Sequence, residues 1–164
     1  MIMPVQVTDH IQELLVLVVR FTRARRHVLI NNLRRMDREG FVPQDLAVEE
    51  FTQQLHLAIN EHVLRRRLVL RDNPHVRFGA QGRLELVPET DCTAQELLNR
   101  DSEAYLRYET QRLVETSLNE RLAMKMLRSH VHHLLVRQGA GEATCPRPFP
   151  STDRAALTDD RMDP

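Results

Sequence analysis

The chain has 164 residues, enough for one domain and a tail. Aromatic residues make up only 4% and tryptophan is absent, a composition typical of long, narrow helical proteins rather than compact globules. The 23 acidic and 23 basic residues cancel, so the basic excess of most nucleic-acid-binding proteins is missing. The apolar run at 14–19 is too short for a signal-peptide core or a membrane span. Composition alone therefore indicates a soluble cytoplasmic protein.

A long first helix is predicted over residues 9–39, capped by Thr8 or Asp9 and stopped by Gly40. Its apolar residues recur mostly every three or four positions and so share one face. They include Ile11, Leu15, Val18, Leu29, Leu33 and Met36. Four arginines crowd into positions 20–26. They form either a solvated flank or a contact strip for an acidic neighbour.

The middle region is predicted to contain one helix and one hairpin. Pro43 keeps the chain out of helix at Val42, and a second helix is expected over about 45–68. Its apolar stripe is Leu46, Phe51, Leu55, Ile59 and Val63. Two short β-like runs, 76–78 and 83–87, flank the turn sequence GAQG and predict a hairpin. Because a lone hairpin is marginally stable, it must lean on the helices or on a partner.

The last element is predicted to be a long helix over 101–138, preceded by a short turn with a Thr93–Glu96 capping box. One row, spaced by multiples of seven, comprises Leu106, Leu113, Leu127 and Leu134. Its companion row is Thr110, Ser117, Met124 and Val131. Heptads sustained this long indicate a coiled-coil-like seam. Glu120 interrupts the leucine row, so the seam is expected to complete itself against another helix.

Together these elements predict a mainly α fold. Long N- and C-terminal helices would pack as a coiled-coil-like pair, with a middle helix and a small β-hairpin. Residues 1–141 would form one domain, with a middle region at 42–100. The glycines at 139 and 141 would end the last helix, and 142–164 would be a proline-rich disordered tail.

The sequence offers no convincing catalytic constellation. His130 and His133 are three apart and would share a helix face, but a zinc site needs a third ligand. An exposed or interfacial histidine cluster is the simpler interpretation. Cys92 and Cys145 are expected to be free thiols. Because no phosphate-binding loop or nucleophile motif appears either, no enzyme, cofactor or metal is predicted.

The stretch NNLRRMDREGF, residues 31–41, resembles the N-terminal motif of the bacterial flagellar rod proteins. That motif reads approximately Asn-Asn-(Ile/Leu)-Ala-Asn-x-(Asp/Asn)-Thr-Pro-Gly-(Tyr/Phe). The matching residues, which align without a gap, are Asn31, Asn32, Leu33, Asp37, Gly40 and Phe41. Arg35 replaces the usual third asparagine, and Arg38 and Glu39 replace the usual Thr-Pro.

The resemblance continues downstream and covers about 11–137. RDNPHVRFG is similar to the segment after the second helix of the proximal rod proteins, and 113–129 is similar to their C-terminal helix. The helix match rests on Leu113, Glu115, Ser117, Leu118 and Leu127. The segment 101–106 departs from the family and keeps only its final leucine, Leu106. The tail beyond 141 has no counterpart in the family.

The resemblance implies a non-catalytic subunit, without cofactor, of the drive shaft that transmits torque from motor to hook. Its partners would be other rod subunits and the adaptor at the membrane ring and export gate. Copies would join in a homo-oligomeric helical assembly, without nucleic acid or membrane insertion. The chain would reach the periplasmic rod by export without a cleaved signal peptide.

The expected assembly interface combines the motif residues on both terminal helices. It comprises Asn31, Asn32, Leu33, Asp37, Gly40, Phe41, Leu106, Leu113, Glu115, Ser117, Leu118, Met124, Leu127, Val131 and Leu134. Within it, Asn31 and Asn32 are expected to hydrogen-bond across a helix–helix contact, where a polar pair fixes register. The simpler interpretation of the pair is a frayed helix end.

Other classes of function stay open. The main alternative is a cytoplasmic helical adaptor or regulator that binds a partner through the same seam. A nucleic-acid-binding helical protein would use the arginines at 20–26 and 65–67, although the zero net charge weakens this interpretation. A metalloenzyme built on His130 and His133 is the remotest alternative.

Overall fold

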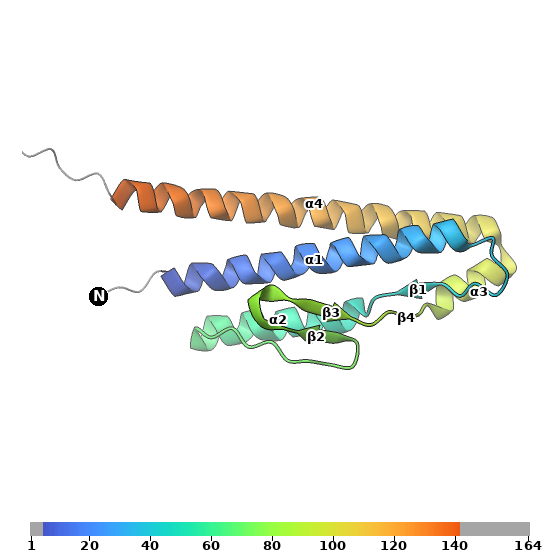
Figure 1. Ribbon diagram of the computed structural model, residues 1–164, viewed down its shortest axis with the longest axis horizontal. Helices are drawn as coiled ribbons and strands as arrows, with labels where there is room; N and C mark the ends of the chain where they lie inside the picture. The colour runs from blue at the N-terminus through green and yellow to red at the C-terminus, as the bar shows by residue number, and fades with distance from the viewer. Residues whose placement is uncertain (1–4, 142–164) are drawn as a thin grey trace, which may run out of the picture.

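The structure, a computed structural model, describes residues 5–141. Its elements, in chain order, are α1 (Val5–Arg35), β1 (Gln44–Asp45), α2 (Val48–Arg65), β2 (Val76–Phe78), a 3-10 turn (Ala80–Gly82), β3 (Leu84–Leu86), β4 (Glu89–Thr90), α3 (Cys92–Arg100) and α4 (Ser102–Gly141). The two terminal helices lie antiparallel along each other, and α2 and the β2–β3 hairpin lie on the other side of α1 (Figure 1). The prediction of a mainly helical fold with paired terminal helices is confirmed.

The apolar core lies where α1, α2 and the hairpin meet. Leu17 and Phe21 of α1, Leu46, Phe51 and Val76 form its buried centre. The rings of Phe21 and Phe51 are stacked with centroids 4.0 Å apart. In the hairpin, Val76 pairs with Leu86 and Phe78 with Leu84, and all four pack in or against this core. The hairpin therefore leans on the chain's own helices.

Several predicted boundaries are wrong, each for a physical reason. α1 ends at Arg35 rather than at 39, because a turn begins there, in which the Arg38 amide bonds to the Arg35 carbonyl (2.9 Å). α2 begins at Val48 rather than near 45, because Gln44–Asp45 pairs with Glu89–Thr90 as a second antiparallel sheet. Nothing in the local pattern marks these two-residue strands, since they depend on a contact between distant segments.

The end of α2 and the cap of α3 also differ from the predictions. Arg66 adopts a left-handed conformation (φ 56°) and ends α2 at Arg65, short of the predicted 68. Ile59 and Val63, predicted in its apolar stripe, are exposed. The capping box at Thr93 is wrong, because Asp91 caps α3 by accepting the Ala94 amide (2.9 Å). Asp101 caps α4 in the same way, so the predicted start of that helix is confirmed.

The α1–α4 contact uses a face of α4 next to the predicted leucine row. The buried residues of α4 are Tyr105, Glu109, Thr116, Glu120 and Ala123. Apart from Tyr105, the buried side chains of α4 are therefore small or charged rather than leucines. The helix continues through the two glycines to Gly141, the last described residue, so the predicted end at 138 is wrong. The proposed tail, 142–164, lies outside the described residues.

Candidate functional site

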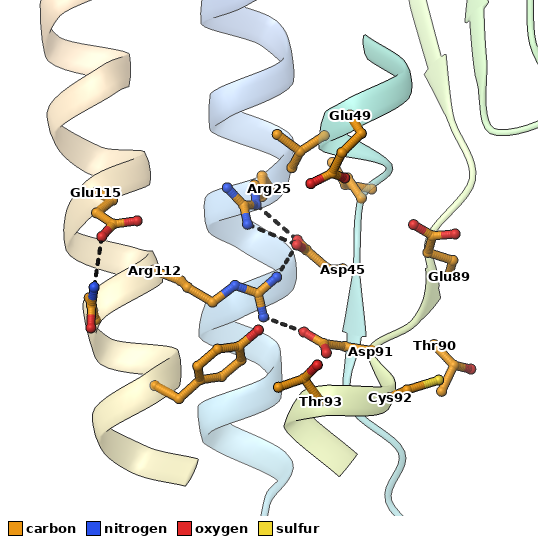
Figure 2. Close-up of a pocket in the computed structure, with 14 residues that line it drawn as sticks. Arg25, Asp45, Glu49, Glu89, Thr90, Asp91, Cys92, Thr93, Arg112 and Glu115 are labelled. Atoms are coloured by element: carbon orange, nitrogen blue, oxygen red, sulfur yellow. Dashed lines mark hydrogen bonds and ion pairs between the residues drawn. The ribbon is translucent and has the colours of Figure 1, made fainter. Parts of the chain in front are cut away.

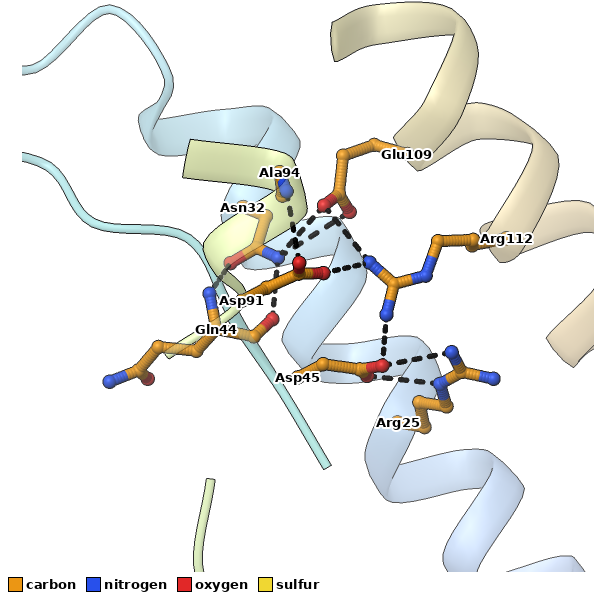
Figure 3. A network of polar contacts seen from close by, with 8 residues as sticks. All are labelled: Arg25, Asn32, Gln44, Asp45, Asp91, Ala94, Glu109 and Arg112. Atoms are coloured by element: carbon orange, nitrogen blue, oxygen red, sulfur yellow. Dashed lines mark hydrogen bonds and ion pairs between the residues drawn. The ribbon is translucent and has the colours of Figure 1, made fainter. Parts of the chain in front are cut away.

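A network of buried and half-buried charged groups ties α1, β1, the start of α3 and α4 together (Figure 3). On α1, Arg25 binds Asp45 of β1 with two parallel hydrogen bonds, from Nε to Oδ1 (2.9 Å) and from Nη2 to Oδ2 (2.8 Å). From α4, Arg112 reaches the same Asp45 with Nη2 and the capping residue Asp91 with Nη1. Arg112 thus bridges two carboxylates, and two cations face two anions. We call these residues, with Asn32, Gln44 and Glu109, the arginine–carboxylate network.

Burial would lower the pKa of Arg112 if it acted alone. The facing carboxylates of Asp45 and Asp91 outweigh that effect and raise the pKa of the guanidinium. Its Cζ also lies 4.8 Å from the centroid of the Tyr108 ring, in cation–π geometry. Arg112 is therefore a permanent charge held in one place by three neighbours.

Asn32 joins α1 to β1 and to α4. Its Nδ2 donates to the Gln44 carbonyl (2.7 Å) and faces both carboxyl oxygens of Glu109 (3.4 Å each). Its Oδ1 accepts the Gln44 amide (3.2 Å). The side chain is buried, whereas that of Asn31 is exposed. Within residues 5–141, Asn32 makes a contact between helices, whereas the expectation for Asn31 has no counterpart there.

Replacing Asn32 with alanine is expected to lower the free energy of unfolding by about 1–3 kcal/mol, because the polar groups of Gln44 and Glu109 lose their partner. Asn31→Ala is the matched control and should change it by less than about 0.5 kcal/mol, because that side chain is exposed. Urea unfolding of both variants measures the difference. Equal losses would contradict the assignment of separate roles to the two asparagines.

Glu109 is the unusual member of the network, because its side chain is fully buried. Burial raises the pKa of its carboxyl from 4.5 to about 7, although Arg112 and the Asn32 hydrogen bond oppose the rise. Its Oε1 lies 3.6 Å from Arg112 Nη1. The two arginines are already matched by Asp45 and Asp91, so Glu109 is a third carboxyl without a cation of its own.

Glu109 should make stability fall as pH rises. Between pH 4.5 and about 7 the unfolded chain has this carboxyl ionised while the folded chain keeps it protonated, so folding is favoured at the lower pH. Across this pH range the free energy of unfolding loses about 3 kcal/mol through the titration of Glu109. Glu109→Gln lacks the titration, so it should gain stability over the wild type as pH rises and keep the gain above pH 7.

The control for this comparison is Glu103→Gln, which changes a highly exposed glutamate of the same helix. Chemical unfolding at a series of pH values gives the difference for each variant. A stability difference between Glu109→Gln and the wild type that stays constant with pH would contradict the raised pKa.

Another buried carboxyl, Glu120, explains the arginine-rich segment of α1. Its oxygens lie 3.1 Å from Arg23 Nε and 3.3 Å from Arg26 Nε. Arg20 donates from Nη1 to the Gly82 carbonyl in the hairpin turn. All four arginines of this segment are therefore engaged within the chain. The acidic neighbours of this arginine segment are thus Glu120 and Asp45 of the same chain. Glu120 is also the residue that interrupts the leucine row.

An open depression of about 770 Å³ lies over the network (Figure 2). Arg25, Arg112, Asp45 and Asp91 line it, with Glu49, Glu89, Glu115 and the exposed Cys92 around them. Glu109, the carboxyl whose pKa burial raises, is not among the lining residues, and none of them is a histidine.

The other predicted interface residues fall into an exposed and a half-buried group. Leu106, Glu115 and Leu118 are exposed, as are Asp37 and Gly40. The half-buried ones are Leu33, Phe41, Leu113, Ser117, Met124, Leu127, Val131 and Leu134. Asp37, Gly40 and Phe41 come together around a hollow of about 500 Å³ beside α3, at the turn after α1. The motif residues are thus spread along the helix pair. The network residues Asp45, Asp91 and Arg112 were not among the residues predicted from the sequence.

Among residues 5–141, no group of three or more histidine, cysteine or acidic side chains is placed to hold a metal ion. The same part of the chain contains no helix that is long and apolar enough to cross a membrane. Cys92 is a free, exposed thiol, and Cys145 lies outside the described residues. The chain matches no family model, no curated protein and no solved structure.

Proposed function

We propose that this chain is a structural, non-catalytic subunit of the bacterial flagellar basal-body rod, most like the proximal rod protein FlgB. The motif at 31–41 and the similar segments of the middle region and α4 suggest this family. The observation that carries the proposal is the antiparallel pairing of the long terminal helices α1 and α4 (Figure 1). Asn32, one of the motif residues, takes part in that pairing.

An exposed apolar row on α4 gives the proposed subunit a surface for assembly. Val114, Leu118, Leu122 and Met126 follow one another at intervals of four and are each more than half exposed. A monomer leaves this row in water, which is unusual for so contiguous a set. Helical stacking of subunits would bury it, because a heterologous contact repeats the same pair of surfaces along the assembly.

In this proposal the partners are other rod subunits and the adaptor at the membrane ring and export gate. The subunit would lie in the periplasmic rod after export without a cleaved signal. A cytoplasmic helical adaptor is the second candidate, because the same row would accept an amphipathic helix of one partner protein. The two candidates differ in whether loss of the chain removes the rod.

Deletion of the gene and complementation tests the proposal. The deletion strain should lack rods in electron micrographs of its basal bodies, and Leu118→Asp should fail to restore them while keeping a wild-type circular dichroism spectrum. Leu118→Met is the matched control, because it keeps an apolar side chain at the same exposed position. Intact rods in the deletion strain would contradict the proposal and favour the adaptor.

A further inference from the structure

An apolar groove runs between α1, α2 and α4 toward the free end of α4. Its inner hollow, about 340 Å³, is lined mainly by apolar side chains of all three helices, among them Val18, Phe51 and Leu122. Its outer hollow, about 430 Å³, lies between α1 and α4 and includes Ile11 and His133. The two hollows adjoin, because Leu15, Leu122 and Met126 line both. Ile11, Leu122 and Met126 are exposed large apolar residues.

The inner hollow also contains a buried polar atom without a partner. The Thr116 hydroxyl is buried on α4 and makes no hydrogen bond within the described residues, although Thr116 lines the hollow. An uncompensated buried hydroxyl is costly. A bound segment with a free backbone group would satisfy it, which a purely apolar ligand would not do.

The α4 segment beside this groove is strongly basic. Residues 121–137 contain four lysine or arginine residues, three histidines and no acidic residue. The chain after Gly141, residues 142–164, contains five acidic and three basic residues, a net charge of −2. It also carries two apolar sites, Phe149 and Ala155–Ala156–Leu157. Charge therefore favours the return of this segment along α4.

The length of the segment matches the groove. Met126 lies fifteen residues before Gly141, about 22 Å along the helix, and Leu122 about 28 Å. Eight extended residues take Phe149 about 26 Å beyond Gly141, and sixteen take Leu157 about 53 Å. Phe149 can therefore reach the outer hollow, and Leu157 reaches the inner one with chain to spare.

We infer that the groove between α1, α2 and α4 is the docking site of the chain's own C-terminal segment, residues 142–164. Phe149 occupies the outer hollow, Ala155–Leu157 occupies the inner one, and the acidic residues face the basic turns of α4. A docked segment covers Leu122 and Met126, so Val114 and Leu118 are the members of the apolar row that remain for the contact between subunits. The inference does not depend on the proposed function, because it concerns contacts within one chain.

The test uses the full chain with Cys92→Ser, which leaves Cys145 as its single thiol. A nitroxide on Cys145 should weaken the NMR methyl signals of Ile11, Leu15 and Met126 relative to the reduced, diamagnetic sample. The methyl signals of Leu57 and Leu106, which do not line the groove, should keep their intensity. A Phe149→Asp, Leu157→Asp double change should abolish the loss at the groove. Thr158→Asp, which adds a charge and removes no apolar side chain, should preserve it.

A second sample separates a self-contact from contact between copies. It mixes methyl-labelled chain without nitroxide and spin-labelled chain without isotope. Docking within one chain predicts no signal loss in this mixture. Groove signals that weaken in the mixture as well as in the first sample would overturn the inference and assign the groove to a second copy. Uniform or absent weakening in the first sample would also overturn it, because the segment would then not occupy the groove.

Discussion

Replacing Arg112 with alanine is expected to lower the free energy of unfolding by about 3–5 kcal/mol. Arg112 bridges Asp45 and Asp91, and it is the nearest cation to Glu109. Its removal leaves Asp91 without its guanidinium partner and leaves Asp45 with Arg25 alone. The uncompensated Asp91 carboxylate and the weaker pairing of Asp45 account for the size of the loss, which urea unfolding at neutral pH measures.

The matched control is Arg107→Ala, one turn and a half earlier on α4. The Arg107 guanidinium is exposed and lies 3.6 Å or more from its acidic neighbours, Asp101 and Glu103. Exposed ion pairs contribute at most about 1 kcal/mol, so this variant should be nearly as stable as the wild type. If both variants lost the same amount, the network would not be what joins α4 to the rest of the fold.

Phe51→Ala is also expected to lower the free energy of unfolding by about 3–5 kcal/mol, because it removes a large apolar side chain from the core. Phe51 is buried, stacks on Phe21 and lies 6.4 Å, between ring centroids, from Phe78 of the hairpin. Its truncation leaves a cavity where α1, α2 and the hairpin meet. Thermal unfolding should show a lower melting temperature.

Leu57→Ala, on the same helix, is the control, because Leu57 is 45% exposed and lies outside the core. It should lower stability far less than Phe51→Ala. Comparable melting temperatures for the two variants would contradict the placement of the core against α2.

The periodic parts of this fold were predictable from the sequence. Apolar spacing in residues 9–39 and heptads in 101–138 indicated two long helices, and turn residues around GAQG indicated the hairpin. The cap at Asp101 was predictable for the same reason, because it depends only on neighbouring residues. Each of these features depends on residues that are close together in the sequence.

The arginine–carboxylate network was not predictable, because its members lie far apart in the chain. Arg25 and Asp45 are twenty residues apart, and Asp45 and Arg112 are sixty-seven apart. Glu120 was one indication, because an acidic residue within a leucine row is buried only when it is paired with a cation. The arginines at 20–26 were a second indication, because they form the densest basic run on α1. Pairing those two observations would have anticipated the Arg23 and Arg26 contacts.

The same reasoning explains the error about the seam. The leucine row predicted apolar contacts, whereas the face of α4 toward α1 contains Glu109, Thr116 and Glu120. Charged residues rarely count as core in a pattern search, because they are buried only when paired. Several leucines are therefore left exposed on α4, among them Leu106, Leu118 and Leu122.

Mass spectrometry of purified hook–basal bodies from the source organism tests the central proposal most directly. A rod subunit should be present at several copies per structure, together with the other rod proteins. If the other rod proteins are found and this chain is absent, the rod proposal is contradicted and the cytoplasmic adaptor becomes the better account of the exposed α4 row.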